Sequence, residues 1–152
     1  MRLRSPELLW KWSRDLHRRG WKLPARIVKT LNFAMHKCLL PAEGEAGSDV
    51  ILEHYALGIV MHPQVRIGHR CRIYHHVTLA AETWIGSPHF ITVEDGATIG
   101  AHSIVVARPN SALTIGRSAV LGAGSVLTKS IPPFEIWAGN PAHKIGDVPQ
   151  TQ

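Results

Sequence analysis

The sequence predicts an all-β solenoid, a parallel β-helix of triangular coils, preceded by a short α-helical cap. Two observations predict this fold. An aliphatic side chain recurs at every sixth position over most of the 152 residues, whereas apolar side chains in the first forty residues have helical spacing. A six-residue period matches neither an α-helical turn nor simple strand alternation. We therefore expect a helical cap at 1–41, a β-helix at 42–131 and a tail at 132–152.

The cap is expected to contain two helices. The run Ser5-Pro6-Glu7 supplies an N-cap, a first-turn proline and an acidic first turn. Gly20 ends this helix, and a second helix opens near Pro24 and ends by Pro41. One apolar face is expected on each helix, made by Leu8, Leu9, Trp12 and Leu16, and by Ile27, Val28, Leu31, Met35, Cys38 and Leu39.

The six-residue repeat predicts thirteen short strands, each followed by a corner. Its inward positions are Ala46, Leu52, Met61, Ile67, Ile73, Leu79, Ile85, Val93, Ile99, Val105, Ile115, Leu121 and Leu127. Three such units close one coil, so coils should stack at the strand spacing of about 4.8 Å. The rhythm slips by three residues after Leu52, by two after Ile85 and by four after Val105. Insertions into a solenoid become loops on its working face, so we expect the chemistry beside these slips.

The positive charge belongs to the cap. The chain carries 17 Lys+Arg and 11 Asp+Glu, of which residues 1–40 hold ten and two. The repeat is therefore slightly acidic, and no nucleic-acid partner is expected. Two interpretations of residues 1–40 remain open: a solvated basic face, or contact with an anionic membrane or polyanion.

Other gross features favour a cytoplasmic protein, with a peripheral position at the inner face of the membrane as the extension of that expectation. Two cysteines, without a CxxC pair, indicate a reducing compartment. No apolar run reaches the roughly 20 residues that span a bilayer, and charged residues interrupt any signal-like N-terminal stretch.

Several motifs resemble those of the hexapeptide-repeat acyltransferases. They are Leu52-Glu53-His54, Gly58-Ile59-Val60, Val77-Thr78-Leu79, Leu121–Val126 and the tail run Trp137-Ala138-Gly139-Asn140-Pro141-Ala142. Over residues 41–146 the chain is similar to the serine acetyltransferase-like branch, and close to small sugar and polysaccharide O-acetyltransferases. The resemblance implies a left-handed β-helix, a homotrimer, and acetyl-CoA as acyl donor in the cleft between subunits, with no metal.

The resemblance also implies roles for individual residues. His54 matches the general base that takes the acceptor's proton during direct transfer, a role that suits imidazole because its ordinary pKa lies near neutrality. Glu53, or another carboxylate, would hold the His54 tautomer, or Glu53 would bind the acceptor. His89 would bind the acceptor or the oxyanion from the neighbouring chain. The positions implied to contact acetyl-CoA are Ala81, Ala101, Ala123 and Lys129.

The acceptor is left open by departures from the serine-specific pattern. Pro88 stands where that branch has an arginine, and Cys38-Leu39-Leu40 stands where it has an acidic residue. These departures favour a hydroxyl on a small or glycan acceptor, with serine as the alternative, and the acyl group could be longer than acetyl. A non-catalytic trimeric scaffold is the alternative of another class. A zinc hydratase on this fold is disfavoured because no two histidines stand five positions apart.

Overall fold

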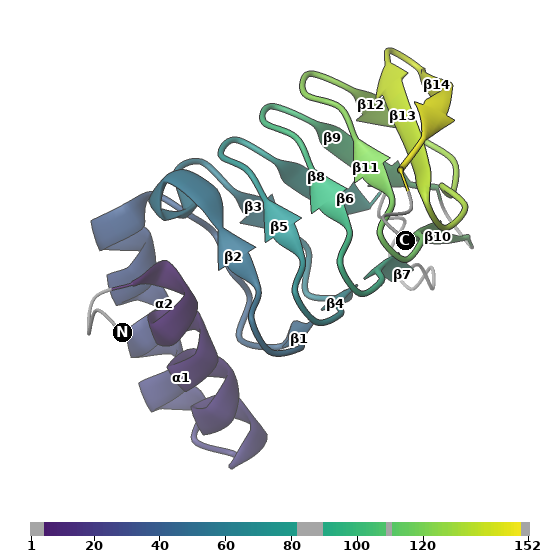
Figure 1. Ribbon diagram of the computed structural model, residues 1–152. Coiled ribbons are helices and arrows are strands. Elements are labelled where there is room, and N and C mark those ends of the chain that lie inside the picture. The colour runs from purple at the N-terminus through teal and green to yellow at the C-terminus, as the bar shows by residue number, and fades with distance from the viewer. Residues whose placement is uncertain (1–4, 82–89, 109–110, 150–152) are drawn as a thin grey trace.

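The computed structural model describes residues 5–81, 90–108 and 111–149. Two helices, α1 (Pro6–Arg18) and α2 (Lys22–His36), lie at one end of a solenoid whose strands run from β1 to β12 (Figure 1). A hairpin of β13 (Glu135–Gly139) and β14 (Ala142–Asp147) lies at the other end. None of the described helices has the length and apolar character needed to cross a membrane.

The solenoid has three faces, and strands within each face pair in parallel. The first face contains β1 (Glu45–Ala46), β4 (Val65–Ile67), β7 (Phe90–Val93) and β10 (Ala112–Ile115). The second contains β2 (Ile51–Leu52), β5 (Arg72–Ile73), β8 (Thr98–Ile99) and β11 (Val120–Leu121). The third contains β3 (Val60–Met61), β6 (Thr78–Ala81), β9 (Ile104–Ala107) and β12 (Val126–Leu127). This arrangement confirms the predicted triangular β-helix.

The strand register corrects one unit of the predicted repeat. Val93, not Ile85, is the register partner of Ile67, and Val105 is the partner of Leu79. The separation is therefore 93 − 67 = 26 positions, eight more than the eighteen of three regular units. Val93 therefore stands on the first face, in the place that three regular units after Ile67 would give to Ile85. Residues 82–89 lie outside the described part of the chain.

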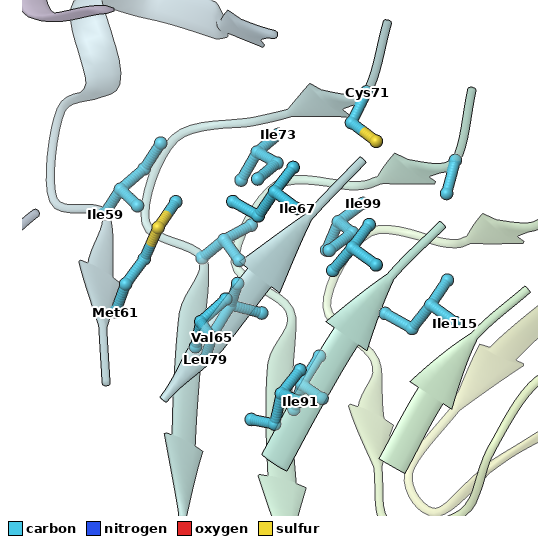
Figure 2. Close-up of a cluster of buried hydrophobic side chains, with 14 of the residues drawn as sticks. Ile59, Met61, Val65, Ile67, Cys71, Ile73, Leu79, Ile91, Ile99 and Ile115 are labelled. Atoms are coloured by element: carbon cyan, nitrogen blue, oxygen red, sulfur yellow. The ribbon is translucent and has the colours of Figure 1, made fainter. Parts of the chain in front are cut away.

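The inward side chains fill a narrow core. Figure 2 shows Ile73, Ile99 and their neighbours pointing into the prism between the faces. Ile73, Leu79, Ile99, Ile115 and Leu121 have no solvent-exposed surface. Each coil thereby covers the apolar surface of the next, and this stacking gives the corners fixed positions relative to one another.

The cap covers the first coil through polar contacts as well as apolar ones. A carboxylate oxygen of Glu7 accepts the Leu52 N–H at 3.0 Å, and the Trp10 indole N–H donates to the Pro41 carbonyl at 2.8 Å. Arg14, also buried, donates to the Ala46 carbonyl at 2.9 Å. These bonds satisfy backbone groups that the open end of a solenoid would otherwise leave unpaired.

The limits of α1 agree with expectation, whereas α2 ends at His36, before Cys38 and Leu39, which were expected on its apolar face. Ser5 caps α1 by accepting the Leu8 N–H, and Gly20 follows its end with a φ of 80°. However, Trp12 is 42% exposed, and the buried side of α1 passes instead through Leu8, Leu9, Trp10, Ser13 and Arg14. The expected apolar face of α2 is also exposed: Leu31 is 48% and Ile27 60% accessible, while Ala25 and Asn32 are buried.

The tail continues the solenoid and then reverses. Ile131 bridges to Ile115 on the first face, and β13 pairs in parallel with β11 on the second. Strand β14 then returns antiparallel to β13 and so closes this end of the second face. Both termini of the repeat are thus covered, one by helices and the other by a hairpin.

Candidate functional site

The first slip of the repeat produces a strained corner between the second and third faces. The chain between β2 and β3 contains a short 3₁₀ segment, Glu53–Ala56. His54, Tyr55 and Ala56 have φ values of 53°, 59° and 60°. Side-chain-bearing residues rarely adopt this left-handed region, and three in succession need support from their surroundings. Three successive left-handed residues make this corner a candidate functional position.

His54 is joined to a second histidine from the next coil. Its Nδ1 lies 3.0 Å from Nδ1 of His75, and the two rings meet edge to face with centroids 4.6 Å apart. A regular coil has eighteen residues, and the three-residue insertion lengthens this coil to 21. The residue 21 positions after His54 is His75, which therefore lies beside it on the next coil. One imidazole must donate this hydrogen bond and the other must accept it.

Two further histidines extend this arrangement along the same corner. The ring of His102 lies 5.2 Å from that of His75, and the ring of His76 stacks on His102 at 4.7 Å. We call His54, His75, His76 and His102 the histidine corner. The backbone of Gly58 leaves room for it, since a Cβ there would lie 2.1 Å from Nδ1 of His76. Among the described residues, no group of three metal-ligating side chains is arranged to hold a metal ion.

The surroundings of His75 favour its neutral form. Desolvation and then the neighbouring imidazoles of His54, His102 and His76 lower the pKa of His75 below its ordinary 6.5. A neutral ring keeps one nitrogen lone pair available as a hydrogen-bond acceptor. The histidine corner is therefore suited to accept and hold a proton at one ring without charging its neighbour.

Glu53 pairs with Arg72 and not with His54, although it precedes His54 in the sequence and was a candidate to orient it. Its carboxylate lies 3.8 Å from a guanidinium nitrogen of Arg72, on the second face. Within the described residues, no hydrogen bond or ion pair joins Glu53 to His54. The group that contacts Nδ1 of His54 is the imidazole of His75, in the place where the resemblance implies a carboxylate.

The expected acetyl-CoA positions fall into two groups at opposite ends of the third-face strands. Ala101 and Ala123 stack at the histidine corner, where the Gly124 N–H donates to the Ala101 carbonyl at 2.8 Å. Ala81 is the register partner of Ala107 at the other end of β6 and β9. Lys129 is exposed just beyond β12, near that same end. The third face therefore lies between the two groups.

His89 lies outside the described residues, so its predicted role stays a prediction. The neighbouring chain positions are informative nevertheless. Ala81, the last described residue before 82–89, is the register partner of Ala107, which lies just before the other gap in the described chain.

His75 is the contact that sequence reasoning did not assign. His75 could have been found from the length of the coil, because the insertion after Leu52 lengthens that coil from eighteen residues to 21 and so places His75 next to His54. The next register along the second face places His102 beside His76, 26 positions further along the chain.

Comparisons with known proteins agree with this architecture. No family model matches the chain. Serine acetyltransferase of Mycobacterium tuberculosis is 29% identical over 137 residues, which is 90% of this chain and 56% of that protein. Serine acetyltransferase 4 of Arabidopsis thaliana is 31% identical over 140 residues, covering 92% of this chain and 36% of the relative. The chain thus spans about half or less of these relatives.

Solved structures give the same result. Soybean serine acetyltransferase as the apoenzyme superposes with a TM-score of 0.84 at 26% identity, covering 92% of this chain and 56% of that one. The soybean enzyme complexed with serine gives a TM-score of 0.82 with the same identity and coverage. These likenesses establish the fold as a left-handed parallel β-helix and include the two helices at its end.

Proposed function

Since the chain belongs to the hexapeptide-repeat, left-handed β-helix acyltransferases, we propose that it moves the acetyl group of acetyl-CoA to an acceptor hydroxyl. The observation that carries the proposal is the strained corner that presents His54. Nδ1 of His54 is hydrogen-bonded to His75, and among the described residues no contact involves Nε2 of His54. An imidazole oriented through one nitrogen, with the other open, is the arrangement that a general base needs.

The proposed reaction is a direct transfer. Nε2 of His54 takes the proton of the acceptor hydroxyl while the oxygen forms a bond to the thioester carbonyl carbon. The carbon–sulfur bond then breaks, and the leaving thiolate takes the proton from Nε2. Free thiol and an acetyl ester are the products, and His54 returns to its starting state.

Acetyl-CoA is proposed to lie along the third face. Ala101 and Ala123 present little bulk at the histidine corner, so an extended pantetheine arm could approach the backbone closely. Lys129 would meet the phosphates at the far end of the strands. Ala101 and Ala123 lie at one end of the third-face strands and Lys129 at the other, and this separation supports a ligand bound in an extended form.

Serine is the acceptor that the names of the relatives support, and we propose it first. A sugar hydroxyl is the second candidate, favoured by one specific observation. Leu39 stands where the serine-specific pattern has an acid, and it forms a β-bridge with Val60 on the third face. No charged group at this position is available to hold the amino group of serine.

A homotrimer is proposed to complete the site. The outer surface of the third face is the most apolar of the three. Leu39, Val60 and Ile104 are aligned along it and are 43%, 40% and 40% exposed. The corresponding outward positions of the first face include Glu45 and Arg66. A neighbouring subunit on the third face would lie directly beside His54.

The test is release of free thiol from acetyl-CoA over a panel of serine, simple sugars and nucleotide sugars. We expect one acceptor class to stimulate release, and His54→Ala to reduce it by about 10³-fold or more. His69→Ala is the matched control, because His69 lies at a different corner, against Ser48. No stimulation by any acceptor, or undiminished release by His54→Ala, would contradict the proposal.

A further inference from the structure

The contact between His54 and His75 carries an inference about how the general base is oriented. The two Nδ1 atoms are 3.0 Å apart, and no described carboxylate contacts either ring. We propose that His75 is a positioning residue whose Nδ1 accepts the Nδ1–H of His54 and so leaves the lone pair of His54 on Nε2. This inference rests on the proposed function, because it assigns the partner of the proposed base.

The direction of the hydrogen bond follows from what the reaction requires. A neutral imidazole carries one N–H, so donation from Nδ1 places the lone pair on Nε2. If His75 were the donor, Nε2 of His54 would carry the hydrogen and could not take a proton. Once His54 has taken the acceptor's proton, both of its nitrogens carry hydrogen, and Nδ1–H still needs an acceptor. His75 supplies one in both states.

Neither nearby position that could supply a carboxylate does so. Glu53 pairs with Arg72, and Leu39 occupies the site where the resemblance implies an acid. In serine hydrolases an aspartate accepts the Nδ1–H of the catalytic histidine and stabilises the imidazolium. Here a neutral imidazole would perform the same task without a negative charge.

The groups around His75 keep it able to accept. His54 faces it from the preceding coil, His102 from the following coil and His76 from its own corner, while Tyr74 faces His54. All three neighbours of His75 become positive when protonated, so each opposes a positive charge on its ring. Its backbone is fixed as well, since its carbonyl accepts the His102 N–H at 3.0 Å. The lowered pKa of His75 is consistent with this arrangement.

The proton balance of the reaction does not change. His75 keeps its own hydrogen, on Nε2, throughout the cycle. The acceptor's proton moves to Nε2 of His54 and from there to the leaving sulfur. His75 therefore influences the rate through orientation and stabilisation of the charged His54, and it never takes a substrate proton.

Two substitutions separate this role from simple packing. In His75→Asn the amide oxygen can accept at nearly the place of Nδ1, whereas in His75→Leu nothing can accept. We expect His75→Leu to lower kcat by about 10- to 100-fold with the KM for acetyl-CoA changed less than about twofold. His75→Asn should recover kcat to within about fivefold of the original. His69→Asn is the matched control, because His69 lies at a different corner, against Ser48.

The pH profile provides a further readout that a packing role would not change. In the original protein, the acid limb of kcat/KM should steepen toward a two-proton dependence, because protonated His75 can no longer accept. In His75→Asn this limb should follow one proton. Unchanged kcat in His75→Leu, or an asparagine variant no better than the leucine variant, would overturn the proposal.

A measurement without turnover keeps this inference separable from the proposed function. Nitrogen-15 NMR of histidine side chains distinguishes the two neutral tautomers. We expect His54 as the Nδ1–H tautomer in the original protein and in His75→Asn, and a mixture of tautomers in His75→Leu. The Nε2–H tautomer in the original protein would refute the assignment of His75 even if acetyl transfer is observed. The Nδ1–H tautomer in a protein that transfers no acetyl group would uphold it while the proposed function fails.

Discussion

The left-handed backbone at His54 and its two successors is the smallest feature on which the proposed chemistry depends. Strained φ values persist where surrounding contacts over-determine them. Here the corner is fixed by Leu52, whose N–H is bound by Glu7, and by buried Ala56 and Ile59 on its far side. A rigid corner gives the imidazole of His54 one orientation, which a base acting on a bound hydroxyl requires.

The cysteine thiols should not interfere with a thiol-release assay. Burial raises the pKa of Cys38 to about 11, and burial also raises the pKa of Cys71. Both side chains are free and buried, at 1% and 0% exposure. We expect no reaction with Ellman's reagent in the native protein and two equivalents after unfolding. Rapid native labelling would show that the first coils open readily.

The lowered pKa of His75 has a consequence for stability. The unfolded chain binds a proton at His75 near its ordinary pKa of 6.5, whereas the folded chain resists it. The free energy of unfolding should therefore decrease as pH falls below about 6.5. Between pH 7 and pH 5, the Tm of His75→Asn should decrease by less than the Tm of the original protein. Equal losses in the two proteins would argue against a disfavoured charge at this position.

At the scale of the element, close stacking of successive coils depends on glycine at one defined position. A Cβ on Gly100 would lie 2.5 Å from the backbone nitrogen of Ala123 in the next coil. Backbone cannot rotate away as a side chain can, so Gly100→Ala should reduce the free energy of unfolding by about 1–3 kcal/mol. Denaturant titration measures this. Gly146→Ala is the control, because nothing lies within 4 Å of its added Cβ and its change should be below about 1 kcal/mol.

The repeat strands were predictable because their period encodes their geometry. Inward residues such as Ile67, Ile73 and Leu79 stand at the predicted positions and are buried. The face of Val93 was assigned wrongly, because a six-residue period alone does not give the length of each coil. The exposure of the apolar side of α2 was not predictable for a related reason. Helical spacing shows that an apolar stripe exists, but it does not show what covers the stripe.

The site was predictable in part. The slip after Leu52 and the motif around it led to His54 directly. The partner of His54 was not found, because its identification needs the exact length of a coil and not only the local motif. His75 lies 21 residues away in sequence and 3.0 Å away in space, a relation that the solenoid creates.

At the scale of the whole molecule, the third face is expected to join three copies of the chain. Ile104→Lys places a charge on this face, and it should convert a trimer into monomers in sedimentation analysis and abolish turnover. Ile51→Lys is the matched control, since Ile51 is 41% exposed on the second face and should leave the trimer intact. A trimer that survives Ile104→Lys would exclude the third face as the contact surface.

The central claim is that His54 promotes acetyl transfer from acetyl-CoA to a hydroxyl. The most direct measurement follows trideuteroacetyl-CoA with serine, and then with sugars, and detects the acetylated acceptor by mass spectrometry. The account predicts one deuterated acetyl ester on the acceptor, formed by the original protein and by His69→Ala but not by His54→Ala. An ester formed equally by His54→Ala, or a label found on the protein and on no acceptor, would contradict it.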